Sequence, residues 1–344
     1  MKDQIFIMKK LLKQLTEAFG PSGFEDNIRK LVQAEVKPLA DEIKVDALGS
    51  LIVRKRPSRP TRDTKKIMVA AHMDEIGLMV SHVDENGFVR FSAIGGVFGK
   101  YIHGGRVRFL NGVDGVIGYD RFEKVHEAPA LDKVYIDVGA TSKKNCPVKV
   151  GDVAAFDRPF TEMGNRLVAK SMDDRVGVLV AIETLRALKS TPHDVYFVFT
   201  TQEEVGTRGA ATASYGVDPD VGIAIDVTPA ADTPNAAKME MALGNGPCVK
   251  IQDTGAISDP RVVKWMIQTA EKNKIPYQRE VLLFGGTDAH SIQLTRAGVP
   301  AGCVSIPTRY VHSPSEMVDY TDVQNSVKLL AALLRTPIDL QSAA

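Results

Sequence analysis

The sequence predicts an α/β fold, a mainly parallel-sheet sandwich with a small β-barrel-like domain inserted into it. Three apolar runs that do not alternate with polar residues, 66–71, 195–200 and 221–225, are typical of strands buried on both faces of a parallel sheet. Between residues 76 and about 165 the pattern changes to short alternating runs separated by glycines, which favours a β-rich domain of barrel or sandwich type. Helix-spaced segments resume after it, so this domain interrupts the α/β unit.

The length of the chain fits such an arrangement. Its 344 residues exceed the ~100–200 residues of one ordinary domain. We place the principal α/β domain over residues 1–73 and 166–344, and the inserted β-rich domain over residues 74–165.

The N-terminal segment predicts two helices and a hairpin. Apolar residues recur at helical spacing over 5–19, and the Gly and Pro residues of 20–23 end that helix before a second one. Strand-like runs at 43–46 and 51–54 flank a connection in which Gly49 can adopt a positive φ, as a β-hairpin requires. Further helices are expected at 176–188, 262–271 and 323–334.

Composition excludes several classes of protein. Lys and Arg number 43 and Asp and Glu 42, so there is no strong net charge to attract nucleic acid or an anionic membrane. The three cysteines, Cys146, Cys248 and Cys303, are widely spaced and give no disulfide framework, which suits a reducing compartment. The first 15 residues lack the apolar core of a signal peptide, and no run of ~18 apolar residues occurs. We expect a cytoplasmic protein.

Side chains that can bind metals follow the buried apolar runs. His72 comes directly after the first run, Glu203 and Glu204 after the second, and Asp226 after the third. Ligands gather outside the carboxyl ends of the strands in open α/β sheets, because the loops there converge on one edge. Other groups fit the same edge: Asp173 and Asp174, which open the helix near Arg175, and His312, which follows the run 301–306. The sequence therefore predicts one site.

These residue types fit the chemistry of a pair of metal ions. Two ions bridged by a carboxylate hold a water or hydroxide, lower its pKa and polarise the carbonyl that it attacks. Oxygen and nitrogen ligands without cysteine favour zinc, cobalt or manganese in an open catalytic site. Of the neighbouring acids Glu203 and Glu204, one can bind metal while the other acts as general base. Asp74 can accept the second ring N–H of His72 and fix its tautomer.

Each of these features has a simpler structural explanation when it stands alone. A His-x-Asp sequence after a strand is ordinarily a surface turn, Asp-Asp before a helix an N-cap pair, and Glu-Glu a solvated face. His312 by itself would be a satisfied polar group. The recurrence of such residues at strand ends throughout one chain favours the metal site.

The segments that contain these residues carry a family resemblance. They are AHMDEIGLMV (71–80), SMDDRVG (171–177), TTQEEVGTRGA (200–210), IAIDVTPA (223–230), GGTDAH (285–290) and RYVHSPSEM (309–317). In this order they resemble the dinuclear metallopeptidase family of the TET, glutamyl and deblocking aminopeptidases. The match covers nearly the whole chain.

The resemblance implies a function for each candidate ligand. Asp173 bridges two divalent metal ions, which would be zinc, cobalt or manganese. His72 and Asp226 complete one site, and Glu204 and His312 complete the other.

The resemblance also implies the reaction and the assembly. Glu203 is the general base: it deprotonates a metal-bound water that attacks the first peptide carbonyl, and it then passes the proton to the leaving amine. The peptide bond between Asp173 and Asp174 is expected to be cis. The inserted domain resembles the family's oligomerisation and access domain, which implies peptide substrates and a homo-oligomer, a dodecamer built from dimers.

Three other functions remain open from the residues. A related metal-dependent amidohydrolase would remove acyl groups from N-acyl amino acids. A glycosidase would need two carboxyl groups ~5–9.5 Å apart and no metal. A non-catalytic scaffold on the same fold would have lost ligands or the base, whereas this chain has the full set.

Some residues receive no firm assignment. His290 follows the stretch 286–289 and either contacts substrate or faces solvent. Arg175 and Arg309 lie in motifs near the site and could face an acidic substrate side chain. Four histidines that match no ligand motif are expected to be structural or on the surface: His82, His103, His126 and His193.

Overall fold

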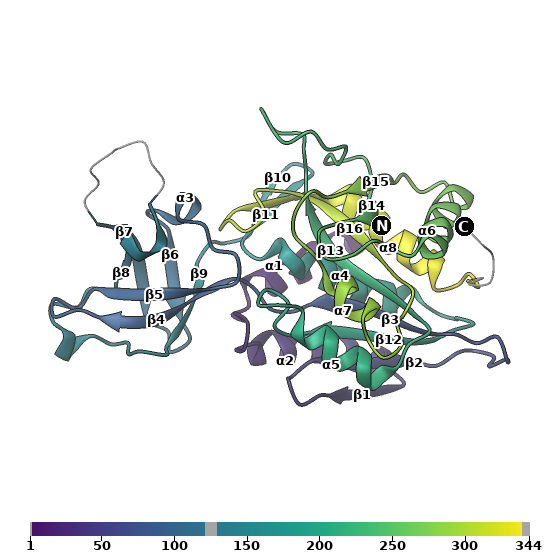
Figure 1. Ribbon diagram of the computed structural model, residues 1–344, viewed down its shortest axis with the longest axis horizontal. Helices are drawn as coiled ribbons and strands as arrows, with labels where there is room; N and C mark the ends of the chain where they lie inside the picture. Colours follow the sequence, from purple (N-terminus) through teal and green to yellow (C-terminus); the bar gives the residue numbers. More distant parts are fainter. Residues whose placement is uncertain (1, 121–128, 339–344) are drawn as a thin grey trace.

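The protein consists of a large α/β unit and a smaller closed β-barrel, which projects to one side of it (Figure 1, left). The structure is a computed structural model that describes residues 2–120 and 129–338. No helix in these ranges combines the length and apolar character needed to cross a bilayer.

An eleven-stranded mixed sheet forms the large unit. Its strands in spatial order are β1 (Glu42–Val45), β2 (Leu51–Lys55), β12 (Asp194–Thr200), β3 (Lys66–His72), β13 (Val221–Pro229), β16 (Ala301–Arg309), β17 (Glu316–Asp319), β11 (Arg166–Ala169) and β10 (Thr161–Met163), with β14 (Cys248–Gln252) beside β16 and β15 (Gln278–Val281) beside β14. The four central strands β12, β3, β13 and β16 are parallel, and their neighbours β2 and β17 run antiparallel to them. The predicted parallel arrangement is therefore found at the centre.

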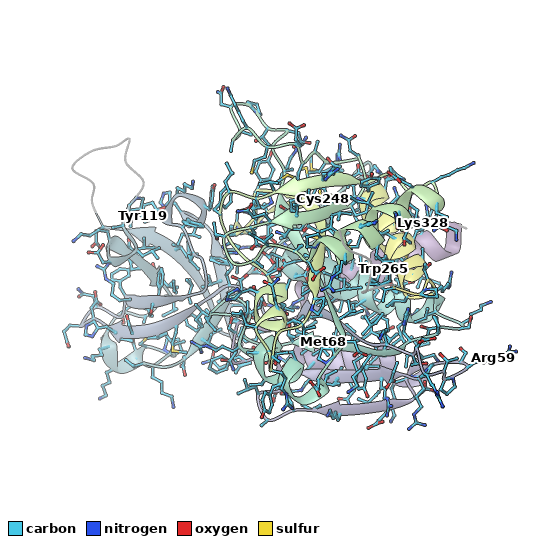
Figure 2. The ribbon with its side chains drawn as sticks, turned by 45° about the vertical axis from the view of Figure 1, so that its right-hand side comes forward. Arg59, Met68, Tyr119, Cys248, Trp265 and Lys328 are labelled. Carbon is cyan, nitrogen blue, oxygen red and sulfur yellow. The ribbon has the colours of Figure 1, made fainter. Side chains whose placement is uncertain are left out.

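Helices cover both faces of this sheet. Side chains alternate along β3, so Val69 and Ala71 belong to one apolar core and Met68 and Ala70 to another. The first core lies under α1 (Lys2–Glu17), α2 (Asp26–Val36), α4 (Met172–Ala187), α6 (Pro260–Lys272) and α8 (Tyr320–Leu333), and the second under α5 (Arg208–Val217) and α7 (Asp288–Gln293). Met68 and Trp265, both labelled in Figure 2, belong to these two different cores.

The inserted β-rich segment is a six-stranded antiparallel barrel with a core of its own. Its strands in order around the barrel are β4 (Gly77–Val83), β5 (Val89–Ile94), β8 (Val134–Asp137), β7 (Asp114–Tyr119), β6 (Arg106–Phe109) and β9 (Val153–Phe156). The short helices are α3 (Gly99–Ile102), η2 (Leu131–Lys133) and η3 (Lys143–Asn145) in this segment and η1 (Lys37–Leu39) after α2. After β9 the chain returns to the large sheet through the hairpin of β10 and β11.

The β1–β2 hairpin agrees with the sequence prediction, but the third predicted strand is longer than expected. The hairpin is confirmed: β1 and β2 pair antiparallel with Val45 opposite Leu51, and Gly49 has a φ of +100°. The third apolar run does not end before Asp226, because β13 stays paired with β16 as far as Pro229. Asp226 therefore lies within a strand instead of after one.

Candidate metal centre

The central parallel strands bring the candidate ligands to one region of the sheet edge. His72 is the last residue of β3 and lies in register with Thr200, the last residue of β12, after which Glu203 and Glu204 follow. Asp173 lies in the first turn of α4, and its peptide bond to the next residue is cis, as expected from the family resemblance. His312 follows β16 in the connection to β17.

The Asp173 carboxylate lies between two histidines. One oxygen, Oδ1, is 2.9 Å from Nε2 of His72, and the other, Oδ2, is 3.4 Å from Nε2 of His312. The His312 Nε2 atom is also 3.3 Å from Oε2 of Glu204. One carboxylate thus faces two separate imidazoles with its two oxygens, which is the geometry of a bridging ligand.

Two further carboxylates approach His72. Its Nε2 atom lies 3.9 Å from Oδ1 of Asp226 and 3.9 Å from Oε2 of Glu203. The structure therefore brings together all five side chains expected to bind metal and the one expected to act as base.

Burial sets the protonation of these carboxyl groups. It raises the pKa of Glu203 and Asp226 well above the usual range and that of Glu204 to about 7, and nearby carboxylates act in the same direction. Burial also raises the pKa of Asp173, but the hydrogen bonds with His312 and His72 outweigh it and lower this pKa below its ordinary value. Asp173 is thus the carboxylate that the two imidazoles hold ionised.

The donor set fits divalent cations. Two sets of three residues could each hold an ion, because the ligand atoms within each set lie within 4.8 Å of one another. One set is His72, Asp173 and Glu204, and the other is His72, Asp174 and Asp226. Buried carboxylates at such distances repel one another and need compensating positive charge. Neither group contains cysteine, and imidazole with carboxylate suits zinc, cobalt and manganese.

Asp174 is a ligand candidate that the sequence reasoning left unassigned. Its Oδ1 accepts a hydrogen bond from the backbone N–H of Gly177 at 3.1 Å, and its buried Oδ2 has no hydrogen-bond partner within the described structure. The Oδ1 atom thus accepts a backbone hydrogen bond at the beginning of the regular part of α4. Asp173, by contrast, directs both oxygens at imidazoles.

Asp74 holds three parts of the site together. Its oxygens accept hydrogen bonds from Ser22 Oγ at 2.6 Å and from the backbone N–H groups of Glu203 and Glu204 at 3.0 and 3.1 Å. Nδ1 of His72 lies 3.5 Å from Asp74 Oδ1, a contact longer than an ordinary hydrogen bond. Asp74 therefore positions the Glu203–Glu204 segment at least as directly as it orients the His72 ring.

Glu316 plays a part that the sequence reasoning missed. It is buried, and its two oxygens accept hydrogen bonds from the backbone N–H of Asp173 at 2.9 Å and of His312 at 2.7 Å. This carboxylate thereby joins the bridging residue to the loop of the second histidine. The only signal in the sequence was its place in the motif that contains His312.

The inserted barrel contacts the site directly through Gly95 and Gly96, another feature that the sequence did not reveal. A Cβ atom at Gly96 would lie 2.3 Å from Nδ1 of His312, and one at Gly95 would lie 3.0 Å from Oε2 of Glu204. The close approach requires residues without side chains. The barrel therefore limits where these two side chains can lie.

Residues left open by the sequence take defined places. Nδ1 of His290 lies 2.5 Å from the carbonyl oxygen of Gly255, so this histidine holds a neighbouring loop. Asp288, two residues earlier, is buried and accepts a hydrogen bond from Thr200 Oγ1 at 2.5 Å. Of the unassigned histidines, His193 is buried and contacts the carbonyl oxygen of Thr336, and His126 lies outside the described residues.

The two arginines considered for substrate binding are already engaged. Arg175 is fully buried and donates to the carbonyl oxygen of Leu15 at 2.6 Å. Nε and Nη2 of Arg309 donate to Asp232 at 2.8 and 2.9 Å. Arg175 is therefore inaccessible to a substrate, and Arg309 is already paired with a carboxylate, which argues against that expectation.

A known protein family and a curated relative match most of this chain. The family model for M42 glutamyl aminopeptidase matches residues 49–329. The lysyl aminopeptidase of Pyrococcus furiosus is 38% identical over 340 residues, which cover 94% of this chain and 96% of that protein.

Solved structures of similar proteins have the same fold. Aminopeptidase APDkam598 of Desulfurococcus kamchatkensis superimposes with a TM-score of 0.93 at 42% identity, covering 97% of this chain and 96% of that one. The TET1 peptidase of Pyrococcus horikoshii, which can assemble into a tetrahedron or a large octahedral shell, superimposes with a TM-score of 0.85 at 33% identity, covering 95% and 99%. The chain thus belongs to the M42 glutamyl aminopeptidase family, and it is a metal-dependent aminopeptidase.

Proposed function

We propose that this aminopeptidase uses two divalent cations that share Asp173. His72 and Asp226 would complete the first site, and Glu204 and His312 the second. The observation that carries the proposal is the placement of the two Asp173 oxygens, one toward each histidine. When bound, the cations supply a water of lowered pKa and polarise the scissile carbonyl. Zinc, cobalt and manganese all suit these ligands.

Glu203 moves the proton in this proposal. Its Oε2 lies 3.9 Å from Nε2 of His72, so it reaches the same space as the ligands without facing the second histidine. It accepts a proton from the attacking water and passes that proton to the leaving amine. Burial raises its pKa, and nearby positive charge acts in the opposite direction, so metal loading favours the ionised form that a base requires.

We also propose that the insertion, residues 74–165, serves oligomerisation and substrate access within a dodecamer. The assembly of the Pyrococcus horikoshii relative supports the oligomer, and the contact of Gly96 with His312 supports a link between insertion and site. Light scattering of the intact protein tests the assembly. A particle of twelve 37.4 kDa chains is expected, and a monomer would contradict the proposal.

The function is tested by comparing peptides with free and acetylated N-termini. We expect the protein to release the first residue of the free peptide, to lose this activity with a chelator, and to regain it with zinc, cobalt or manganese. Faster hydrolysis of acylated substrates would instead support the amidohydrolase that removes acyl groups. Activity that a chelator leaves intact would contradict a metal mechanism of either kind.

The separate roles of the two neighbouring glutamates are tested by Glu203→Gln and Glu204→Gln. Glu203→Gln should keep two metal ions per chain and lower kcat by about 10²–10⁴-fold, because only the base is lost. Glu204→Gln, the matched variant one residue away, should lose metal from the site that includes His312. Metal content is measured by elemental mass spectrometry beside peptide hydrolysis. A loss of metal in Glu203→Gln would show that the two roles are assigned wrongly.

The contact between barrel and site is tested by Gly96→Ala. Its Cβ would displace the His312 ring, so we expect the affinity for the cation at the proposed Glu204–His312 site to fall by about 10–100-fold, as when partners that orient a metal ligand are altered. Calorimetric titration of metal-free protein measures this affinity. Gly216→Ala in α5 is the control, because beyond the neighbouring residues and backbone of that helix no atom lies within 4 Å of the added Cβ. Equal affinities in the two variants would argue against His312 as a ligand held by the barrel.

A further inference from the structure

The inserted barrel presents exposed aromatic side chains next to the candidate metal centre. Phe98 follows the Gly95–Gly96 turn, is 49% exposed, and has its ring centroid 6.2 Å from that of His312. Tyr101, 42% exposed, meets the Phe98 ring edge-to-face at 6.1 Å between centroids. Together with Lys100 these residues form what we call the aromatic rim.

The barrel holds the rim in place. Ile102, at the end of α3, is buried in the barrel core, and Tyr119 of β7, labelled in Figure 2, donates a hydrogen bond to the carbonyl oxygen of Gly99. The segment is therefore anchored on the side that faces the barrel. Because the anchored segment leaves Phe98 and Tyr101 exposed, the rim is a preformed apolar surface beside a metal ligand.

Burial orients a peptide relative to the rim. The candidate ligands Asp173 and Asp226 are buried, whereas Phe98 and Tyr101 are 49% and 42% exposed. An aminopeptidase releases one residue at a time, so the residue before the scissile bond lies at the buried centre and the rest of the peptide extends toward solvent. The chain beyond the scissile bond therefore passes the exposed rim.

We propose that the aromatic rim is the subsite for the residue that follows the scissile bond, and that Phe98 favours peptides whose second residue is aromatic or a branched apolar residue. This inference rests on the proposed function. Aromatic rings pack favourably edge-to-face or offset against other aromatic and apolar side chains. The exposed Phe98 ring beside His312 can make such a contact with the side chain of the peptide's second residue. A glycine at that position in the peptide would leave the contact unmade.

The test compares peptides that share a first residue and differ in the second. For each protein, kcat/KM is measured with Phe and with Gly as the second residue, and the ratio of the two values is the readout. Phe98→Ala should lower this ratio by about three- to tenfold, the size of one aromatic contact. Phe98→Tyr should restore it. Leu110→Ala removes an apolar side chain of the same barrel that is 53% exposed, and should leave the ratio unchanged.

The remaining outcomes separate this inference from the proposed function. If Phe98→Ala lowers both kcat/KM values equally, Phe98 acts by supporting His312 and the subsite is overturned. An unchanged ratio with unchanged rates overturns it as well. If the wild-type protein releases no N-terminal residue from any peptide, the proposed function is wrong, and this inference, which rests on it, is wrong as well.

Discussion

The structure depends on one electrostatic constraint, the convergence of buried carboxylates around two histidines. Asp173 touches both imidazoles, and Glu204 and Asp226 lie against one imidazole each. Carboxylates in an apolar interior repel one another and are costly to ionise. Divalent cations bound there would remove that cost, since they would supply the positive charge that the two imidazoles alone do not. The cluster therefore makes physical sense as the metal centre of an aminopeptidase.

The surrounding fold holds this cluster in position. The parallel strands bring the backbone segments to one edge, but two further buried carboxylates fix their relative placement. Asp74 accepts the backbone N–H groups of Glu203 and Glu204, and Glu316 accepts those of Asp173 and His312. The barrel completes the arrangement from outside, through the close approach of its Gly95–Gly96 turn. The sheet, its loops and the inserted barrel thus all position side chains of the same site.

The sequence predicted those features that depend on local patterns. A buried parallel strand appears in the sequence as a continuous apolar run, and the end of that run can be read directly. His72 was therefore placed correctly at the end of β3. Features that depend on distant contacts were missed. The extension of β13 beyond Asp226 requires pairing with β16, and the role of Glu316 requires two backbone N–H groups from distant segments. The engagement of Arg309 by Asp232 likewise joins residues 77 positions apart.

The proposed sharing of Asp173 by two cations is tested most directly by anomalous diffraction from crystals loaded with cobalt. The proposal predicts two anomalous peaks per chain, one near His72 and Asp226 and one near Glu204 and His312, with an oxygen of Asp173 bound to each. A single peak would contradict the account. So would two peaks that share Asp174, whose buried Oδ2 lacks a hydrogen-bond partner among the described residues.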